Sequence, residues 1–367
     1  MQAIKATSGY IKNFAFTLLC AVACILASGC GSVIYDGEQP CDVSYKVTFR
    51  YDMNMKWADA FANEVTSIRL YAFDRNGTLV WEKEETGEAL ARPGYSMKLP
   101  LKAGDYTLIA WGGLNNATKA SDRTESFEAA DLLPGNSAME QLYVHINKKE
   151  TPAGNYSDEP LFPLFHGKLE VSLPEWDAKS ANDHTYNMPL VKNTNHVRII
   201  LQHLSGEAVN VDDFNFVIDS DNGVMDHDNN LVKENRVHYL PHSLTTGSAG
   251  YDPVDGSSQP GLPGSRPPVV SVNVAIADLT VGRLMAGEKA TLTVTKAKNG
   301  EIAARIPLTD YALLLKNGYG RQMTDQEFLD RQDEYALTFF LDERDNWINT
   351  SIIINSWKIV LDNINFD

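Results

Sequence analysis

A cysteine directly after three small residues is the clearest chemical feature of this chain. Ala27, Ser28 and Gly29 stand immediately before Cys30. This spacing resembles the bacterial lipobox, in which the cysteine thiol takes a diacylglyceryl group, the chain is cut in front of it, and the new amine is acylated. Because two or more acyl chains hold a protein stably on a membrane, we predict that lipidation of Cys30 tethers everything after it.

The residues before Cys30 have the parts of an export signal. Lys5 and Lys12 lead, an apolar run of about 13 residues follows at 14–26, and small residues precede the cut. The run is shorter than the roughly 20 residues that span a bilayer. Leucine is usual at position 27, where this chain has alanine. Two alternatives therefore stay open: an ordinary cleaved signal with an incidental thiol, and an uncleaved membrane helix.

Four aspartates form the densest cluster of oxygen ligands: Asp219, Asp221, Asp226 and Asp228. A calcium site needs about six to eight converging oxygens. The EF-hand pattern also needs glycine where this chain has Leu231, and it needs a glutamate at its twelfth position, which this chain lacks. The pattern fails at both positions. We therefore predict that these aspartates are turn residues and that the chain holds no metal.

Histidines and tryptophans offer two further candidate sites. His238 and His242 have Pro241 between them in an extended context, which separates them by about 13 Å at roughly 3.3 Å per residue. That distance is too long for one metal ion, so a structural role is predicted. The tryptophans could stack on a sugar, but packing in the core is favoured. They are Trp57, Trp81, Trp111, Trp347 and Trp357.

Signatures of catalysis are absent from the sequence. It has no HExxH, no GxSxG, no paired-cysteine zinc spacing and no glycine loop that cradles phosphate. We therefore expect no enzymatic activity and no cofactor.

Charge and length set the class of protein. The 367 residues carry a net charge of -16, and removing residues 1–29 takes away two lysines and no acid, which leaves about -18. Such a surface repels nucleic acid and anionic headgroups, so nucleic-acid binding is excluded. The 43% of hydrophobic residues suffices for a core. The remaining length predicts two domains on the usual range of about 100 to 200 residues each.

The number of cysteines indicates that the hydrophobic core, and not disulfides, stabilises the fold. Cys20 and Cys24 lie inside the predicted signal, so only Cys30 and Cys41 belong to the mature chain. No intramolecular disulfide framework is possible if Cys30 carries lipid. The role of Cys41 stays open between pairing with another chain and remaining free.

Alternating patterns predict a series of strands in the first half. Residues 45–51 alternate with period two, which indicates a half-buried strand. Residues 53–64 are predicted as one short helix with Trp57 on its apolar face. Asn76 and Gly77 between two apolar runs predict a hairpin turn. Residues 106–111 are continuous enough for an interior strand.

Short strands with glycine and asparagine turns between them predict β-sandwiches with Greek-key connections. The segment 99–111 is also similar to the strand entry of transthyretin-like sandwiches. Thr324 and Glu327 have capping-box spacing, so a helix is predicted over 325–331. Residues 247–268 are dense in Gly, Pro and Ser and predict a surface loop. Further strands are predicted at 164–173, 197–201, 214–218, 270–276, 290–295, 302–306, 336–341 and 352–361.

The predicted organisation is all-β, with two tandem transthyretin-like Greek-key β-sandwich domains and short helices in loops. A polar, turn-rich passage from Pro174 to Pro189 marks the predicted boundary. The predicted parts are a signal peptide at 1–29, a lipidated tether at 30–43, an N-terminal sandwich at 44–187 and a C-terminal sandwich at 188–367.

Several segments together resemble one family. Cys30 is followed by Ile34-Tyr35-Asp36 and Cys41, and the longer matching segments are 47–77, 165–171, 220–230, 323–335, 337–342 and 354–361. The chain resembles the FimB-type fimbrial anchor lipoproteins of Bacteroidetes from Cys30 to its end, most specifically in the segments that begin at Val47 and Met323.

The resemblance implies an outer-membrane lipoprotein that acts as a fimbrial anchor or minor subunit, attaches fimbriae to the cell surface and limits their length. Its expected partners are fimbrial shaft or accessory subunits and, through lipid on Cys30, the outer membrane at the cell surface. The alternative is a surface adhesin lipoprotein that binds glycans or a host, because a fold does not settle a function.

Strand addition offers a way to join subunits. We expect the strand at 45–51 to stay in place because the tether fixes it, so that this chain contributes a strand to a neighbour but accepts none. Residues 352–366 are the candidate contributing segment, and an ordinary final strand of the second sandwich is the alternative.

Overall fold

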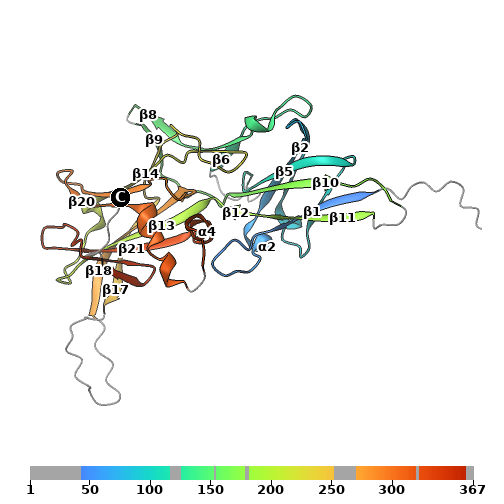
Figure 1. The fold of residues 1–367 in the computed structure, drawn as a ribbon. Helices are drawn as coiled ribbons and strands as arrows, with labels where there is room; N and C mark the ends of the chain where they lie inside the picture. Colours follow the sequence, from blue (N-terminus) through green and yellow to red (C-terminus); the bar gives the residue numbers. More distant parts are fainter. Residues whose placement is uncertain are drawn as a thin grey trace, which may run out of the picture. The chain divides into compact units, whose positions relative to one another are not determined.

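The computed structural model describes residues 43–115, 125–152, 154–177, 182–251, 270–319 and 322–360 (Figure 1). The predicted signal and tether, with Cys30 and Cys41, lie outside the described residues, as do 252–268 of the predicted loop and 361–366 of the candidate contributing segment. All the strands given below belong to one compact unit of the chain. Among the described helices, none is long and apolar enough to cross a membrane.

The elements up to residue 192 are mostly strands, with bounds as follows: β1 (Ser44–Arg50), α2 (Phe61–Glu64), β2 (Ser67–Asp74), β3 (Leu79–Thr86), η1 (Gly87–Ala89), β4 (Ser96–Leu99), β5 (Gly104–Gly112), β6 (Phe127–Ala129), η2 (Met139–Gln141), β7 (Tyr143–Ile146), β8 (Lys149–Thr151), β9 (Gly154–Ser157), β10 (Phe165–Leu173), β11 (Asp183–Pro189) and β12 (Val191–Lys192).

The elements after residue 193 continue the series: β13 (Thr194–His203), η3 (Val211–Asp213), β14 (Phe214–Ser220), β15 (Val224–Asp226), β16 (Val237–Tyr239), β17 (Ser243–Tyr251), β18 (Val270–Gly282), β19 (Thr291–Lys296), β20 (Ile302–Pro307), α3 (Leu308–Leu313), η4 (Lys316–Gly318), α4 (Asp325–Arg331), β21 (Glu334–Leu341), β22 (Ser351–Ile354) and β23 (Trp357–Val360).

Four main sheets make up two sandwiches. The first sandwich combines the three-stranded sheet β11-β1-β4 with the five-stranded sheet β12-β10-β5-β2-β3. The second combines the six-stranded sheets β17-β18-β13-β21-β22-β23 and β20-β19-β14-β16-β9-β8. The predicted all-β fold with short helices in loops is confirmed. That both halves are transthyretin-like with Greek-key connections stays a prediction.

Strands cross between the two halves of the sequence. After β5 the chain forms β7, which pairs with β15 of the second half, and β9, which pairs in parallel with β16. The chain then returns to the first sandwich as β10, which pairs with β5. A domain division between residues 187 and 188 stays a prediction. The strand pairs β7–β15 and β9–β16 cross that division.

One apolar cluster joins the two sandwiches. In β2, Tyr71 and Phe73 belong to the same buried cluster as Val197 and Ile199 of β13. Their alternate neighbours in β2, such as Leu70, are equally buried but lie outside that cluster. Because successive side chains of a strand point to opposite faces, the five-stranded sheet is buried on both faces here.

The predicted hairpin and the predicted capped helix are confirmed. Gly77 has φ of 75° in the turn between β2 and β3, a conformation that glycine adopts without a Cβ clash. The Asp74 carboxylate accepts from the backbone N–H of Asn76 and Thr78. The Thr324 hydroxyl accepts from Glu327 N at 3.0 Å, which caps α4 at the predicted residue.

The predicted helix at 53–64 is wrong over most of its length, because only Phe61–Glu64 is helical. Side chains take the backbone groups that a helix would use: Asn54 donates to Tyr51 O and Ala58 O. Asp59 accepts from the N–H of Tyr51 and of Phe61. Asparagine and aspartate compete with helical hydrogen bonds in this way.

Two other predictions are wrong: the turn-rich passage at 174–189 and the single strand at 352–361. The passage 174–189 contains β11, which pairs in parallel with all of β1. The predicted strand at 352–361 is a hairpin, in which β22 pairs with β23. Asn355 and Ser356 turn the chain with φ of 48° and 73°, which is how a two-residue hairpin loop is made.

Candidate functional site

The first strand is enclosed between two neighbours. All seven residues of β1 pair with β11, and Tyr45–Thr48 pair with β4 on the other side. The strand at 45–51 is therefore confirmed within one residue at each end. It is the central strand of its sheet, so withdrawing it would break pairing on both edges.

Side chains of β1 alternate into the core as the sequence predicts. Tyr45, Val47 and Phe49 are at most 5% exposed. Phe49 stacks on Phe61 at 5.6 Å between ring centroids. Since each fully buried side chain of this size contributes roughly 1.5 to 3 kcal/mol, these three together hold the strand by roughly 5 to 9 kcal/mol before any backbone pairing is counted.

Polar contacts hold the beginning of β1, where the tether enters. Ser44 and Lys46 both bond the Asp183 carboxylate of β11, Lys46 at 3.1 Å. The Ser44 hydroxyl and the Lys46 ammonium hold the pKa of Asp183 below its usual range. The Tyr45 hydroxyl donates to the carbonyl of Pro174, and burial raises the pKa of Tyr45.

β11 was missed because its surroundings are polar and rich in turn residues. Its seven residues include Asp183, Asn187 and Pro189, which are rare in strands. A weak signal was present: His184, Tyr186 and Met188 alternate with more exposed neighbours. Tyr45 stacks on His184 at 5.9 Å between ring centroids, so this face of β11 packs against β1.

The candidate contributing segment folds onto its own sheet as far as it is described. β22 pairs with β21, and β23 pairs only with β22 at the edge. Asn355 accepts from Ala336 N at 2.7 Å and donates to Glu334 O at 2.8 Å, which fixes the turn to β21. This arrangement favours the alternative reading of residues 352–360 as a part of the second sandwich.

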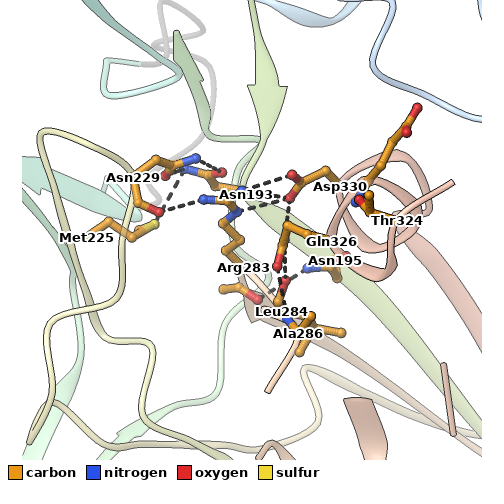
Figure 2. A network of polar contacts seen from close by, with 12 residues as sticks. Asn193, Asn195, Met225, Asn229, Arg283, Leu284, Ala286, Thr324, Gln326 and Asp330 are labelled. Carbon is orange, nitrogen blue, oxygen red and sulfur yellow. Dashed lines mark hydrogen bonds and ion pairs between the residues drawn. The ribbon is translucent and has the colours of Figure 1, made fainter. Parts of the chain in front are cut away.

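A buried polar network surrounds Asn193, where the chain passes from β12 of the first sandwich to β13 of the second (Figure 2). Arg283, at the end of β18, makes a two-pronged ion pair with Asp330 of α4 at 2.9 Å and donates to Asn229 O. Asn193, between β12 and β13, exchanges side-chain amide hydrogen bonds with Asn229 at 2.6 and 3.1 Å. Because every member has a partner, such a network rigidifies its surroundings.

Helix α4 also reaches the loop after β1. Arg331 donates to Asp52 O at 2.9 Å, and its guanidinium lies 3.6 Å from the ring centroid of Trp57. Trp57 has φ of 56°, in a region that bulky residues rarely adopt. The core role predicted for Trp57 is wrong, since 37% of it is exposed.

Lys192 adds an ion triad at the same junction. It bonds Asp333 at 2.6 Å and Glu64 at 3.2 Å, and its side chain is 8% exposed. Burial lowers the pKa of Lys192, and the Asp333 and Glu64 carboxylates outweigh burial and raise it. No spacing in the sequence predicts this triad, because its members are far apart along the chain.

The four aspartates have separate partners. Asp221 accepts from Glu234 N and Asn235 N, and Asp226 accepts from Asp228 N and Asn230 N. These bonds are those of turn residues, as predicted. Asp228 pairs with Lys168 of β10. The prediction of a turn residue is wrong for Asp219, which lies in β14 and pairs with His238 of β16. Within the described part of the chain, no three acidic, histidine or cysteine side chains gather as metal ligands.

The two histidines lie in different segments, and Trp111 packs in the core as predicted. His238 lies in β16, whereas the backbone N–H of His242 donates to Asp278 O of β18. Trp111 is fully buried against His166, at 4.6 Å between centroids. Burial lowers the pKa of His166 to about 3, so this histidine stays neutral at physiological pH.

An open depression lies on the second sandwich. It has a volume of about 550 Å³ and is lined by strands β13, β18 and β21, with Arg198, Asp278 and Glu334 among its polar residues. Arg198 and Asp278 pair with each other at 2.7 Å. Two of the charged side chains in this depression, Arg198 and Asp278, therefore neutralise each other.

Comparison with known proteins gives a consistent family. The family described as fimbrillin-A associated anchor proteins Mfa1 and Mfa2 matches residues 38–363. The minor fimbrium anchoring subunit Mfa2 of Porphyromonas gingivalis is 21% identical over 337 residues, which cover 90% of each chain.

Two solved structures from Bacteroides thetaiotaomicron are similar over nearly their whole length. One, named as a candidate adhesin, is 32% identical with a TM-score of 0.73, covering 88% of this chain and 99% of its own. The other, named as a candidate polysaccharide-binding protein, is 26% identical with a TM-score of 0.70 and the same coverage.

Proposed function

The chain belongs to the family of fimbrillin-A associated anchor proteins, and we propose that it is an outer-membrane lipoprotein that anchors fimbriae to the cell surface. The observation that carries this proposal is the enclosed position of β1. Its first residue, Ser44, follows the tether directly, so a pull on the lipid at Cys30 acts on a strand that is paired on both sides.

The tether keeps the folded body close to the membrane. Residues 30–43 span at most about 45 to 50 Å when fully extended, at roughly 3.3 to 3.6 Å per residue. Acyl chains on Cys30 contribute about 0.8 kcal/mol per buried methylene. A fimbrium bound to the folded body is thereby retained at the surface.

The enclosed strand also gives a reason for a limit on fimbrial length. In strand addition an extended segment of one chain completes the sheet of another. Such a segment could enter this sheet only if β1 left its place between β4 and β11. Since β1 is held on both sides and through its buried side chains, the chain accepts no subunit there and growth ends at this protein.

Replacing the lipidated cysteine tests the anchor. We expect Cys30→Ala to shift both the protein and the fimbriae from the outer-membrane fraction to the medium, measured by fractionation and electron microscopy. Cys41→Ala is the matched control, since it removes the other mature cysteine and leaves the lipid. Fimbriae that stay on Cys30→Ala cells would contradict the proposal.

The alternative is an adhesin that binds glycans, as the names of the two similar solved structures suggest for those proteins. The open depression on the second sandwich is the place where a sugar would bind. Its aromatic residue, Tyr335, is 2% exposed and cannot stack on a sugar ring. A glycan array probed with the mature protein tests this alternative, with Arg198→Ala as the variant that should lose any signal.

A further inference from the structure

The ends of the four main sheets and of the small sheet β15-β7-β6 differ in how they are protected from strand pairing. A strand at a sheet end presents unpaired N–H and C=O groups, and proteins blunt such edges with charges, prolines or short length. Of the ten terminal strands, nine contain at least one charged residue: β3, β4, β6, β8, β11, β12, β15, β20 and β23.

β17 is the exception among these edges. It is the longest of them at nine residues, with the sequence SLTTGSAGY, and it has neither charge nor proline. By contrast β3, the next in length at eight residues, carries Glu82, Lys83, Glu84 and Glu85. Among the described sheet ends, β17 is thus the long one without charge or proline.

The outer edge of β17 is also open in the described part of the chain. Its nine residues pair with β18 on one side, and no backbone hydrogen bond from β17 to any other described segment is found. Leu244 is 46% exposed, and Thr245 and Thr246 are exposed as well. Threonine favours the extended conformation, so the strand presents a regular edge.

We propose that the open edge of β17 is the docking site for an extended, uncharged segment of a fimbrial subunit, which adds a strand beside β17. The proposal rests on the proposed anchoring function and assigns the place where the fimbrium is held. Unpaired backbone groups in a regular strand are satisfied by another strand, and the occupant is therefore a chain segment of about seven to nine residues without proline.

Charge decides between a subunit and a second copy of this chain. Two mature copies, each with a net charge of about -18 after removal of residues 1–29, repel each other. A neutral segment from a subunit meets no charge in β17. The location also fits, because β17 belongs to the second sandwich, whereas the tether enters the first.

Charging the edge tests the proposal in cells that carry the cognate fimbriae. The double variant Thr245→Lys and Thr246→Lys gives β17 the protection that the other edges have. We expect most fimbriae to appear in the medium while the protein stays in the membrane fraction. The matched control is Val80→Lys with Ile302→Lys, which adds the same charge to exposed positions of the already charged edges β3 and β20.

Photocrosslinking decides the same point without disturbing the edge charge. With benzoylphenylalanine in place of Leu244 in the full-length protein, we expect a crosslink to a fimbrial subunit, and none from the same probe at Ile302. A crosslink to a second copy, or no crosslink, would overturn the docking site. So would a folded double variant that retains fimbriae while Cys30→Ala releases them. If cells with Cys30→Ala retain their fimbriae, the anchoring function is overturned. The crosslink from Leu244 then tests the docking site at β17 by itself.

Discussion

The first and last described strands of the chain make an instructive comparison. β1 and β23 are both rich in aromatic or β-branched residues. β1 pairs on both sides, whereas β23 pairs only with β22 at the edge of its sheet. The difference shows that position in the sheet decides how firmly a terminal strand is held, and that composition does not.

Truncating one side chain in each strand should give the largest contrast. We expect Phe49→Ala to lower the free energy of unfolding by about 3 to 5 kcal/mol, because the ring is buried against Phe61 and Tyr95. Ile359→Ala should cost about 1 kcal/mol, because that side chain is only partly buried. Urea unfolding of the mature protein measures both values. Equal losses would mean that β23 is held as firmly as β1.

The turn of the final hairpin should give an intermediate effect. Asn355→Ala removes two hydrogen bonds to β21 and places a Cβ-bearing residue without a polar side chain at φ of 48°. We expect a loss of about 1 to 2 kcal/mol in the free energy of unfolding. Asn355→Gly keeps the backbone conformation and should recover part of the loss. If both variants cost the same, the hydrogen bonds alone hold the hairpin.

The smallest effect is expected at the entry of β1, as a function of pH. The pKa of Asp183 is lowered from its ordinary value of 3.8, first by the Ser44 hydroxyl and then by Lys46. Folding therefore favours the ionised carboxylate, and its stabilisation is present above about pH 4 and lost as the pH falls through the folded pKa. Amide exchange at Ser44 and Lys46 should speed up relative to Asp183→Asn as the pH falls. Identical pH profiles for the two proteins would contradict this role.

Local signals in the sequence predicted elements whose determinants are near neighbours. The Thr324 cap and the Gly77 turn depend on residues within four positions of one another, and both are where the pattern places them. The alternation in β1 depends only on which side chains are apolar. These features survive in the fold because tertiary contacts agree with them.

Elements whose determinants are distant were mispredicted or missed. Residues 53–60 have apolar spacing typical of a helix, but Arg331, far along the chain, takes Asp52 O and covers Trp57. β11 is stabilised by pairing with β1, which outweighs its poor strand composition. The junction around Arg283 and Asp330 has no local signature at all.

By itself the sequence determined the strand periodicity, the turns and the acidic character, because each depends on residue type and short spacing. The export and lipidation signals stay predictions of the same local kind. Only the tertiary structure decided which strands lie inside a sheet and which form its edge, since strand pairing joins segments more than a hundred residues apart, as in β1 with β11. That decision matters for function: it encloses the strand next to the tether and leaves β17 open.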